Sequence, residues 1–364
     1  MREKMTFLIL PVGLSCNIAC KYCYHGCVSK NIKKYERMSD EILEKIMFNA
    51  REFETCDIDF LWHGGEPLLA GIDHFKKAIK FQSKAFLNGS IFSGKVRNVI
   101  QSNMTLFNKK TCDFLMKNKF IISTSIDGDK DSHDANRIFS DGSGTHKNVL
   151  KSISMWRNKG EPIGAVSLIT KSNVHKAEQV YAELKACGIT SCNFHFCGQD
   201  ENSSIDTIPT EKETTDFLKK VFDLWMADDE PGFPIRNFRN VLRVLSGGRP
   251  MDCTSNINGC YGFMSITSNG DVYPCHRYVE RKDYCIGNIL EMSLLEIYNN
   301  AKDMYKNLCS VNKKCTTCEW LNTCGNGCAY ERLIINGSFD SIDPDCFMKK
   351  ELFEHIKEKT IDHF

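Results

Sequence analysis

The sequence predicts an α/β protein whose first part is a partial (β/α)6 TIM-like barrel and whose last part is a smaller cysteine-rich domain. From residue 1 to about 199, short β-branched runs alternate with amphipathic helical windows, a pattern typical of parallel sheets. Ten of the nineteen cysteines lie from Cys253 onward. An open doubly wound sheet also fits the six repeats, because hydrophobic periodicity does not distinguish a closed sheet from an open one.

Six strands and five helical windows are expected in residues 1–199. The strands are predicted at 6–12, 58–62, 96–102, 121–126, 163–169 and 192–196. The helical windows begin near residues that favour helix N-caps, namely Ser39, Asp73, Asn108, Thr145 and Asn173. A capping box of Thr210 and Glu213 opens a further long helix that runs to about Met226. We therefore place the barrel at 1–228.

The remainder, 229–364, is predicted to be a separate module. The segment 228–234 is rich in acidic residues, proline and glycine and is expected to be a linker. Two short runs at 262–267 and 271–275 flank Asn269-Gly270, which predicts a β-hairpin. The module therefore combines a hairpin with most of the cysteines.

Composition excludes several classes of function. The chain has 364 residues, 42% hydrophobic residues and a formal net charge of +1, so we expect no nucleic-acid partner and no anionic membrane surface. No apolar stretch reaches the roughly 18 residues of a membrane span, and the N-terminus has no signal-peptide pattern. A cytoplasmic protein is expected, with its thiols held by iron rather than by disulfides.

The most informative motif is Cys16-x3-Cys20-x2-Cys23, directly after the first strand. Three thiolates can hold a 4Fe-4S cluster and leave its fourth iron open to a ligand. A structural zinc site requires four ligands, so it fits less well. The alternative is three buried or disulfide-forming cysteines in a loop.

Two further motifs follow later strands. His63-Gly64-Gly65-Glu66-Pro67 follows the second strand, where two glycines let the backbone approach a ligand and a carboxylate can accept an ammonium group. Ser125-x-Asp-Gly and Arg137 follow the fourth strand. Taken alone, each of the two motifs is typical of an ordinary turn, and the arginine is typical of a solvent-exposed charge. In a barrel, however, the carboxyl ends of strands are where active sites lie.

The C-terminal cysteines can form metal sites. By spacing alone, Cys315, Cys318, Cys324 and Cys328 form one closed site for zinc or for an iron-sulfur cluster. Four further cysteines, Cys253, Cys260, Cys275 and Cys346, lie in the same region. The remaining eight are expected to be small core residues or free thiols: Cys27, Cys56, Cys112, Cys187, Cys192, Cys197, Cys285 and Cys309.

As a set, these motifs resemble the radical S-adenosyl-L-methionine (SAM) enzymes that carry a SPASM domain, including anaerobic sulfatase-maturating enzymes and SPASM maturases of ribosomally synthesised peptides. The resemblance implies three [4Fe-4S] clusters, the first at the N-terminal cysteine motif. It implies one auxiliary cluster on Cys253, Cys260, Cys275 and Cys328, and another on Cys315, Cys318, Cys324 and Cys346. It implies SAM contacts from Tyr22, Gly64, Gly65, Glu66, Ser125, Arg137 and Gly198.

The sequence departs from the sulfatase-maturating pattern at two positions. In those enzymes the Tyr-Pro-Cys motif is followed by an Asp thought to take a proton from the substrate, whereas Cys275 here is followed by His276. The residue before Gly-Gly-Glu-Pro is commonly Gln there and is His63 here. An imidazole can serve as a base, so His276 is the predicted catalytic residue. The alternative is that it orients a cluster-bound thiolate.

The resemblance implies an enzyme that cleaves SAM to a 5'-deoxyadenosyl radical and removes hydrogen from a residue of a peptide or protein. Because of the two histidines, our first interpretation is a maturase of a ribosomally synthesised peptide that installs a crosslink or a related modification. The second is oxidation of Cys or Ser to formylglycine in a sulfatase. A non-catalytic iron-sulfur electron carrier is the alternative from another class.

The expected partners are the peptide or protein substrate and an electron donor such as flavodoxin or ferredoxin. Because iron-sulfur clusters of this kind are oxygen-sensitive, an anaerobic host is expected. Fifteen residues precede Cys16, too few for a separate leader-recognition domain, so any leader peptide is expected to bind another surface or a separate protein.

Overall fold

The computed structural model describes residues 3–25, 36–87, 92–198, 207–228 and 233–361. The chain forms two compact units, and each is assembled from three stretches of sequence. The first unit comprises Met1–Asn17, Val28–Ile122 and Cys260–Leu308. The second comprises Ile18–Cys27, Ser123–Gly259 and Cys309–Phe364. This partition interleaves the two halves of the sequence, and the division expected at residue 228 stays a prediction.

The sheet of the first unit joins strands from both ends of the chain. Its order is β3-β2-β1-β7-β8-β9. β1, β2, β3 and β7 are parallel neighbours, whereas β7–β8 and β8–β9 are antiparallel. The strands are β1 (Lys4–Ile9), β2 (Asp57–Trp62), β3 (Val96–Ser102), β7 (Phe263–Ile266), β8 (Asp271–Tyr273) and β9 (Gly287–Asn288). The predicted C-terminal hairpin is therefore present and extends the sheet beside β1.

Aromatic side chains fix the register of the parallel strands. Phe7 lies opposite Phe60, and their rings stack with centroids 6.0 Å apart. Trp62 is fully buried, packs edge-on against Phe75 and donates from Nε1 to Asn98 Oδ1 at 3.1 Å. A shift of one residue in register would turn these side chains to the opposite face.

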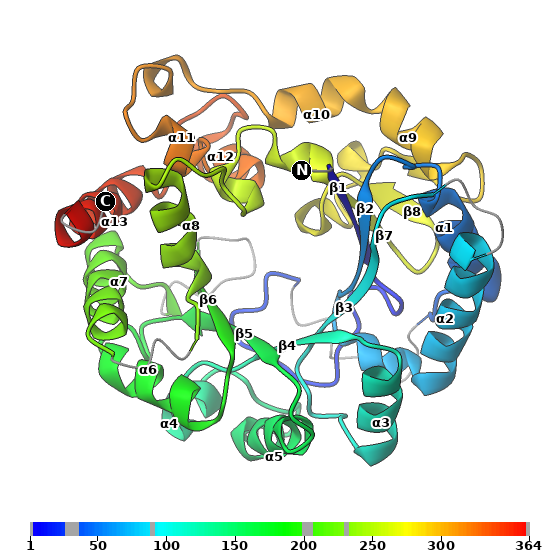
Figure 1. Cartoon of the computed structure of the whole chain (residues 1–364), viewed down its shortest axis with the longest axis horizontal. Helices are drawn as coiled ribbons and strands as arrows, with labels where there is room; N and C mark the ends of the chain where they lie inside the picture. The colour runs from blue at the N-terminus through cyan, green and yellow to red at the C-terminus, as the bar shows by residue number, and fades with distance from the viewer. Residues whose placement is uncertain (1–2, 26–35, 88–91, 199–206, 229–232, 362–364) are drawn as a thin grey trace. The chain divides into compact units, whose positions relative to one another are not determined.

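Helices cover the strands of the first unit on one side, as Figure 1 shows for α1 to α3 beside β1 to β3. The helices of this unit are α1 (Asp40–Ala50), α2 (Ile72–Leu87), α3 (Lys109–Lys117), α9 (Leu294–Asn300) and α10 (Lys302–Leu308). Ser39 and Asn108 accept backbone hydrogen bonds as N-caps, as predicted. α2 instead starts one residue before Asp73.

The second unit repeats the strand–helix alternation with the order β6-β5-β4. Its strands are β5 (Ile163–Ile169) and β6 (Ser191–Phe196), while β4 (Ile121–Ser125) begins in the first unit and ends in the second. Its helices are α4 (Lys130–Asp134), α5 (His146–Arg157), α6 (Ala177–Ala186), α7 (Glu211–Met226), α8 (Arg236–Leu245), α11 (Leu321–Cys324), α12 (Ala329–Asn336) and α13 (Cys346–Thr360). Phe194 of β6 packs edge-on against Phe217 of α7.

Several predicted boundaries need correction. β1 ends at Ile9, before Pro11, because the chain turns there and Gly13 N–H donates to Leu10 O at 3.1 Å. Asn173 is not an N-cap: α6 begins at Ala177. α4 and α8 were not anticipated. Part of the expected linker, 229–232, lies outside the described residues.

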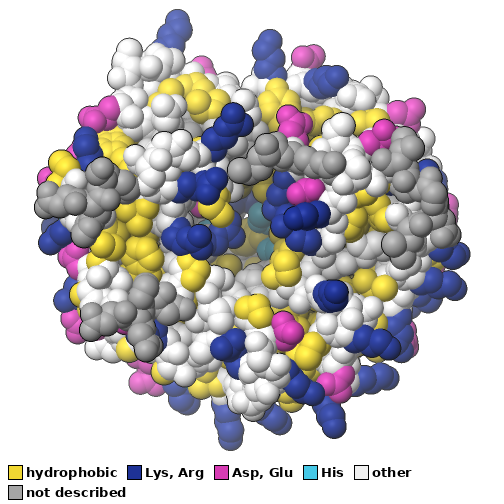
Figure 2. Space-filling model, viewed as in Figure 1, with side chains coloured by type: hydrophobic (Ala, Val, Ile, Leu, Met, Phe, Trp, Pro, Cys, Tyr) yellow, Lys and Arg dark blue, Asp and Glu magenta, His cyan; other side chains and the backbone are white. Residues whose placement is uncertain are grey.

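Thr145 precedes α5 but makes no capping hydrogen bond with its side chain. The capping box of Thr210 and Glu213 forms as predicted, with both of its hydrogen bonds present. No helix in the described part of the chain is long and apolar enough to cross a membrane. On the face drawn in Figure 2, basic side chains are interspersed with acidic ones, as the small net charge leads one to expect.

Candidate cofactor and metal sites

In the first unit, the end of β3 holds the start of the cysteine motif. Asn103 Nδ2 donates to Cys16 Sγ at 3.6 Å and to Asn17 Oδ1 at 2.9 Å. Asn17 Nδ2 in turn donates to Thr105 Oγ1 at 2.7 Å. The Cys16 thiol is therefore oriented by an asparagine that the sequence alone does not distinguish from any other loop residue.

The two glycines after β2 allow the cysteine loop to approach. A Cβ on Gly65 would lie 2.0 Å from the backbone oxygen of Ser15. Gly64 has φ +101° and lies against the backbone of Gly13. Glu66 N–H donates to Ser15 O at 2.9 Å, which joins the two segments. The glycines thus have a structural function beside the predicted one of admitting a ligand.

The carboxylate of Glu66 is fully buried and held by three donors. Leu68 N–H and Ser102 Oγ–H donate to Oε1, each at 2.9 Å, and Asn103 N–H donates to Oε2 at 2.7 Å. Burial raises the pKa of this carboxyl to about 7, against the effect of the three donors. The carboxylate therefore connects the ends of β2 and β3, and its predicted contact with the SAM ammonium stays a prediction.

In the second unit, the loop with Cys20 and Cys23 is tied to the segment 136–138. The N–H groups of Ala19 and Lys21 donate to carbonyls of that segment at 2.7 and 3.0 Å, and Cys23 N–H donates to Cys20 O at 3.2 Å. Because the loop passes from one unit to the other after Asn17, the joint ligation of one cluster by all three cysteines stays a prediction.

A buried carboxylate, Asp127, organises this part of the site. It is 1% exposed and accepts from the Tyr22 hydroxyl, from Leu168 N–H at 2.9 Å, and from Arg137 Nε and Nη2 at 2.8 and 3.1 Å. The guanidinium of Arg137 also lies over the ring of Tyr22. Burial raises the pKa of the Cys20 thiol to about 12, and the nearby Arg137 charge opposes this rise.

The predicted SAM contacts in the second unit follow its strands. Ser125 is the last residue of β4, and Gly198 follows β6 by two residues. Gly198 is exposed, and apart from its chain neighbours no atom of the described residues lies within 4 Å of the position that a Cβ would take. Both occupy the carboxyl ends of strands, as expected for this class of site. Their contacts with SAM stay predictions.

The first unit brings together the two histidines that depart from the sulfatase-maturating pattern. The rings of His63 and His276 lie with centroids 5.0 Å apart. Gly64 N–H donates to His63 Nδ1 at 2.7 Å, which leaves the His63 proton on Nε2. Burial lowers the pKa of His63 to about 4, so the ring is neutral at pH 7. His276 Nδ1 lies 3.5 Å from Cys275 Sγ.

Four of the C-terminal cysteines surround one cavity of the second unit. Its lining includes Cys315, Cys318, Cys324 and Cys346, the set that the resemblance assigns to one auxiliary cluster. Asp343 and Lys349 line the same cavity. Burial raises the pKa of the Cys324 thiol to about 11, Lys349 lowers it and Asp343 raises it. Four sulfur ligands around one cavity fit a closed cluster, because no position is left for another ligand.

The cysteines assigned to the other auxiliary cluster are distributed over both units. Cys260 and Cys275 belong to the first unit, and Cys253 and Cys328 to the second. Cys253 begins a short 3-10 helix, Cys253–Ser255, and Cys328 is the residue before α12. Their shared ligation stays a prediction.

Of the cysteines expected to be structural, Cys56, Cys112, Cys192 and Cys197 are buried. Cys187 and Cys309 are partly buried, and Cys285 is exposed. Cys27 lies outside the described residues.

Comparison with known proteins identifies the family. A model of the radical SAM superfamily matches residues 10–184, and a model of the SPASM iron-sulfur cluster-binding domain matches residues 259–324. A cysteine-type anaerobic sulfatase-maturating enzyme of Clostridium novyi is 30% identical over 97% of this chain and 95% of that protein. The chain is a member of the radical SAM superfamily.

The similarity extends over the whole radical SAM and SPASM chain. A cysteine-type anaerobic sulfatase-maturating enzyme of Clostridium perfringens is 28% identical over 98% of both chains. The solved structure of anSMEcpe with bound AdoMet has a TM-score of 0.88 at 28% identity and covers 99% of both chains. This match confirms the predicted radical SAM fold with a C-terminal SPASM domain.

A more distant match has the same fold. The structure of Streptococcus suis SuiB bound to its precursor peptide SuiA has a TM-score of 0.69 at 18% identity, covering 95% of this chain and 76% of SuiB. At this identity the match informs on the fold alone.

Sequence reasoning missed three residues of these sites. Asp127 stood within the Ser-x-Asp-Gly motif but was interpreted only as part of a turn, although a carboxylate ten residues before an Arg was the available signal. Asn103 gave no signal in the sequence because its partner, Cys16, is remote in the chain. Lys349 gave none because its ion pair with Asp343 forms only when α13 is folded.

Proposed function

We propose that this radical SAM protein is an enzyme that oxidatively modifies a residue within a peptide or protein. The observation that carries the proposal is the division of its cysteines between a three-cysteine loop and a separate four-cysteine cavity. Three thiolates leave an iron open for SAM, whereas four close a cluster and suit it to electron transfer. The similarity to sulfatase-maturating enzymes over nearly the full length supports the same proposal.

The proposed cofactors are SAM and three [4Fe-4S] clusters. When bound at the first cluster, SAM supplies a 5'-deoxyadenosyl radical, which can remove hydrogen from an unactivated carbon. Cys16, Cys20 and Cys23 would hold this cluster, and the two sets of four cysteines would hold the others. Tyr22, Gly64, Gly65, Glu66, Ser125, Arg137 and Gly198 would contact SAM.

For the reaction, we favour a maturase that installs a crosslink or a related modification in a ribosomally synthesised peptide. The specific support is the pair of imidazoles at His63 and His276, 5.0 Å apart, where sulfatase-maturating enzymes have Gln and Asp. At the position of His276, an imidazole carries an N–H that can donate a hydrogen bond, whereas the Asp of the sulfatase-maturating pattern, when ionised, only accepts one. The polar groups offered to the reacting residue therefore differ from those of the relatives.

Formylglycine formation is the second candidate, and a specific observation favours it. The cysteine-type enzymes of two clostridia align over 95% or more of their own length, and anSMEcpe has been solved with AdoMet and the Cp18Cys peptide. In this reaction a Cys or Ser side chain becomes an aldehyde. The chain would then act on a sulfatase with a Cys-x-Pro-x-Arg segment.

The deciding experiment compares two peptides. Anaerobically reconstituted protein is incubated with SAM and dithionite and either a Cys-x-Pro-x-Arg peptide or a candidate precursor peptide chosen from the genes next to its own. We expect 5'-deoxyadenosine in both reactions, no aldehyde in the first peptide, and loss of two hydrogens with a new intramolecular link in the second, measured by tandem mass spectrometry. An aldehyde in the first peptide would overturn the favoured reaction and establish the second candidate.

The same experiment tests the electron-carrier alternative. A carrier would yield no 5'-deoxyadenosine with either peptide, and this outcome would overturn the enzyme proposal as a whole. A His276→Asp variant is the matched control, because it restores the carboxylate of the sulfatase-maturating pattern at one position. Its aldehyde yield, compared with that of the wild type, reports whether residue 276 selects the reaction.

A further inference from the structure

A lysine and an aspartate line the cavity of the four cysteines in the second unit. Lys349 Nζ forms an ion pair with Asp343, and their side chains are 20% and 2% exposed. Asp343 Oδ2 also lies 3.9 Å from Cys324 Sγ. Burial lowers the pKa of Lys349, but the charges of Asp343, Cys324 and Asp345 outweigh it and raise that pKa. Lys349 is therefore a fixed cation beside the sulfur atoms.

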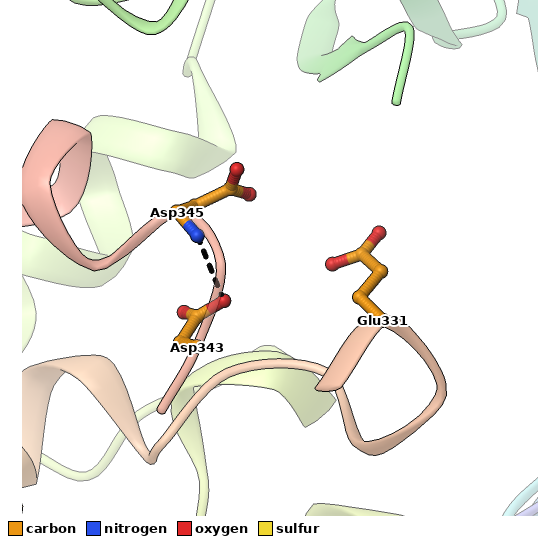
Figure 3. Close-up of side chains that lie close together, drawn as sticks. All are labelled: Glu331, Asp343 and Asp345. Carbon is orange, nitrogen blue, oxygen red and sulfur yellow. Dashed lines mark hydrogen bonds between the residues drawn. The ribbon is translucent and has the colours of Figure 1, made fainter. Parts of the chain in front are cut away.

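The surroundings of this lysine are anionic. Carboxylate oxygens of Glu331, Asp343 and Asp345 lie within 4.8 Å of one another, and Asp345 N–H donates to Asp343 Oδ1 at 3.3 Å (Figure 3). The sulfur atoms of the four cysteines at the same cavity add further negative charge when they hold a cluster as thiolates. A cation in this place therefore has a large electrostatic effect.

Two other cations near the cavity are placed differently. Lys350 also lines it, but its side chain is exposed to solvent, which screens its charge. Arg332 is buried, and its guanidinium donates to the carbonyls of Ser310 and Phe339. Of these three cations, Lys349 is thus the one that is both partly shielded from water and paired with a carboxylate that lies beside a cysteine of the set.

We propose that Lys349, oriented by Asp343, is a positioning residue that sets the reduction potential of the cluster held by Cys315, Cys318, Cys324 and Cys346. The inference rests on the proposed function, which places a cluster there. The potential of such a cluster depends on local charge, on hydrogen bonds to sulfur and on exposure. Reduction adds one electron to an already anionic cluster, so a nearby cation stabilises the reduced state and raises the potential.

The raised reduction potential makes the cluster a better electron acceptor. In the oxidative modification proposed above, the substrate radical loses one electron and one proton; the cluster gains the electron and the proton passes to solvent. A higher potential favours this direction. The negative charge of Asp343 limits the rise in reduction potential, and its ion pair with Lys349 holds the lysine side chain in place.

The test is a redox titration monitored by electron paramagnetic resonance. It uses the full chain with Cys16, Cys20 and Cys23 changed to Ala, so that only the auxiliary clusters contribute. We expect Lys349→Met to shift one of the two potentials to a more negative value, Lys350→Met to shift it much less, and Asp343→Asn to shift it to a more positive value. A potential unchanged in Lys349→Met with full iron content would overturn the proposal.

Iron content separates this failure from failure of the proposed function. The parent variant should hold about eight irons per chain; about four or none would contradict the cluster assignment itself. If Lys349→Met does not retain iron, Lys349→Gln decides the question, because it removes the charge and keeps a polar side chain: a more negative potential supports the proposal and an unchanged potential overturns it. A Cys318→Ala variant identifies which signal belongs to this cavity, because that signal should disappear.

Discussion

His276 is the residue whose chemistry bears most directly on the reaction. It lies beside Cys275 and 5.0 Å, ring to ring, from the neutral His63. If it acts as the base, His276→Ala should keep the formation of 5'-deoxyadenosine and lower the modified peptide by about 100-fold, a usual contribution of a general base. Liquid chromatography with mass detection measures both products, and His175→Ala, at a histidine whose side chain is 71% exposed, is the matched control. Unchanged product would reduce His276 to a residue that orients the Cys275 thiolate.

Asp127 shows how one buried carboxylate can hold several predicted site residues. Its removal leaves Arg137, 10% exposed in its side chain, without an ionic partner. Asp127→Asn should therefore lower the free energy of unfolding by about 3 kcal/mol, the usual cost of breaking a buried ion pair. SAM affinity should fall as well, because Tyr22 and Arg137 both lose the carboxylate that they share. Chemical denaturation and equilibrium binding measure the two effects.

Asp59 offers the control for that experiment. It also pairs with two cations, Lys4 and Arg97, but their side chains are 52% and 42% exposed. Water and salt screen such pairs, so Asp59→Asn should cost about 1 kcal/mol or less and leave SAM affinity unchanged. An equal loss of stability in the two variants would contradict the special position assigned to Asp127.

Gly65 permits the contact between the second strand's loop and the cysteine loop. A Cβ there would lie 2.0 and 2.3 Å from backbone atoms of Ser15, the neighbour of Cys16. Gly65→Ala should therefore displace the cysteine loop and reduce the iron content by about four atoms per chain, with loss of SAM cleavage. Gly142→Ala is the control, because residue 142 has φ +85° but open space around it. Full iron in Gly65→Ala would contradict this account.

At the scale of elements, local signals were reliable where the partner is close in the chain. The capping box of Thr210 and Glu213 starts α7 as predicted, since both hydrogen bonds join residues three apart. Asn173 is not a cap because its side-chain oxygen accepts from Thr170 N–H at 2.8 Å instead of from a helix N–H, while Nδ2 donates to Asp127 O at 2.9 Å. Thr145 likewise donates to Arg137 O instead of capping α5.

The helix α2 carries a buried imidazole that makes stability depend on pH. His74 is 3% exposed; burial, and then the charge of Arg37, lowers its pKa from 6.5 to about 4. Because the folded pKa is the lower one, the unfolded chain binds the proton more readily. The stabilising contribution is complete above pH 6.5 and is lost as the pH falls from 6.5 toward 4.

His74→Phe should remove that part of the pH dependence. Between pH 8 and pH 5, protonation of His74 should lower the free energy of unfolding of the wild type by about 2 kcal/mol. The total decrease in the variant should therefore be smaller by about 2 kcal/mol. Unfolding followed by circular dichroism at several pH values measures the difference. Phe75→Leu is the control, since a neighbouring core substitution should lower stability equally at every pH. Identical pH profiles for His74→Phe and the wild type would refute the assignment.

For the whole molecule, the proposed clusters are separate sites with separate functions. Changing Cys16, Cys20 and Cys23 together to Ala should abolish SAM cleavage and leave about eight irons per chain, in two intact four-iron clusters. Iron analysis and a 5'-deoxyadenosine assay test this expectation. Changing Cys315, Cys318 and Cys324 to Ala is the matched control, since it should remove a different cluster and keep some SAM cleavage. Loss of all iron in either variant would contradict independent sites.

The sequence by itself indicated the family, through its resemblance, and determined the six barrel strands, the helix with the capping box and the C-terminal hairpin. The strands, the helix and the hairpin depend on signals that act over a few residues: a hydrophobic period of two or of 3.6, caps, and turns such as Asn269-Gly270. The four cysteines that line one cavity were likewise selected from the sequence, through the resemblance.

Only the tertiary structure decided which side chains share a site across long separations in sequence. It placed β7 beside β1, His63 beside His276, and Tyr22 on Asp127. It also showed that the Glu66 carboxylate is enclosed by three donors from its own and a neighbouring loop. Hydrogen bonds and ion pairs of this kind depend on burial and on exact approach, and neither is encoded in the spacing of residues within a segment.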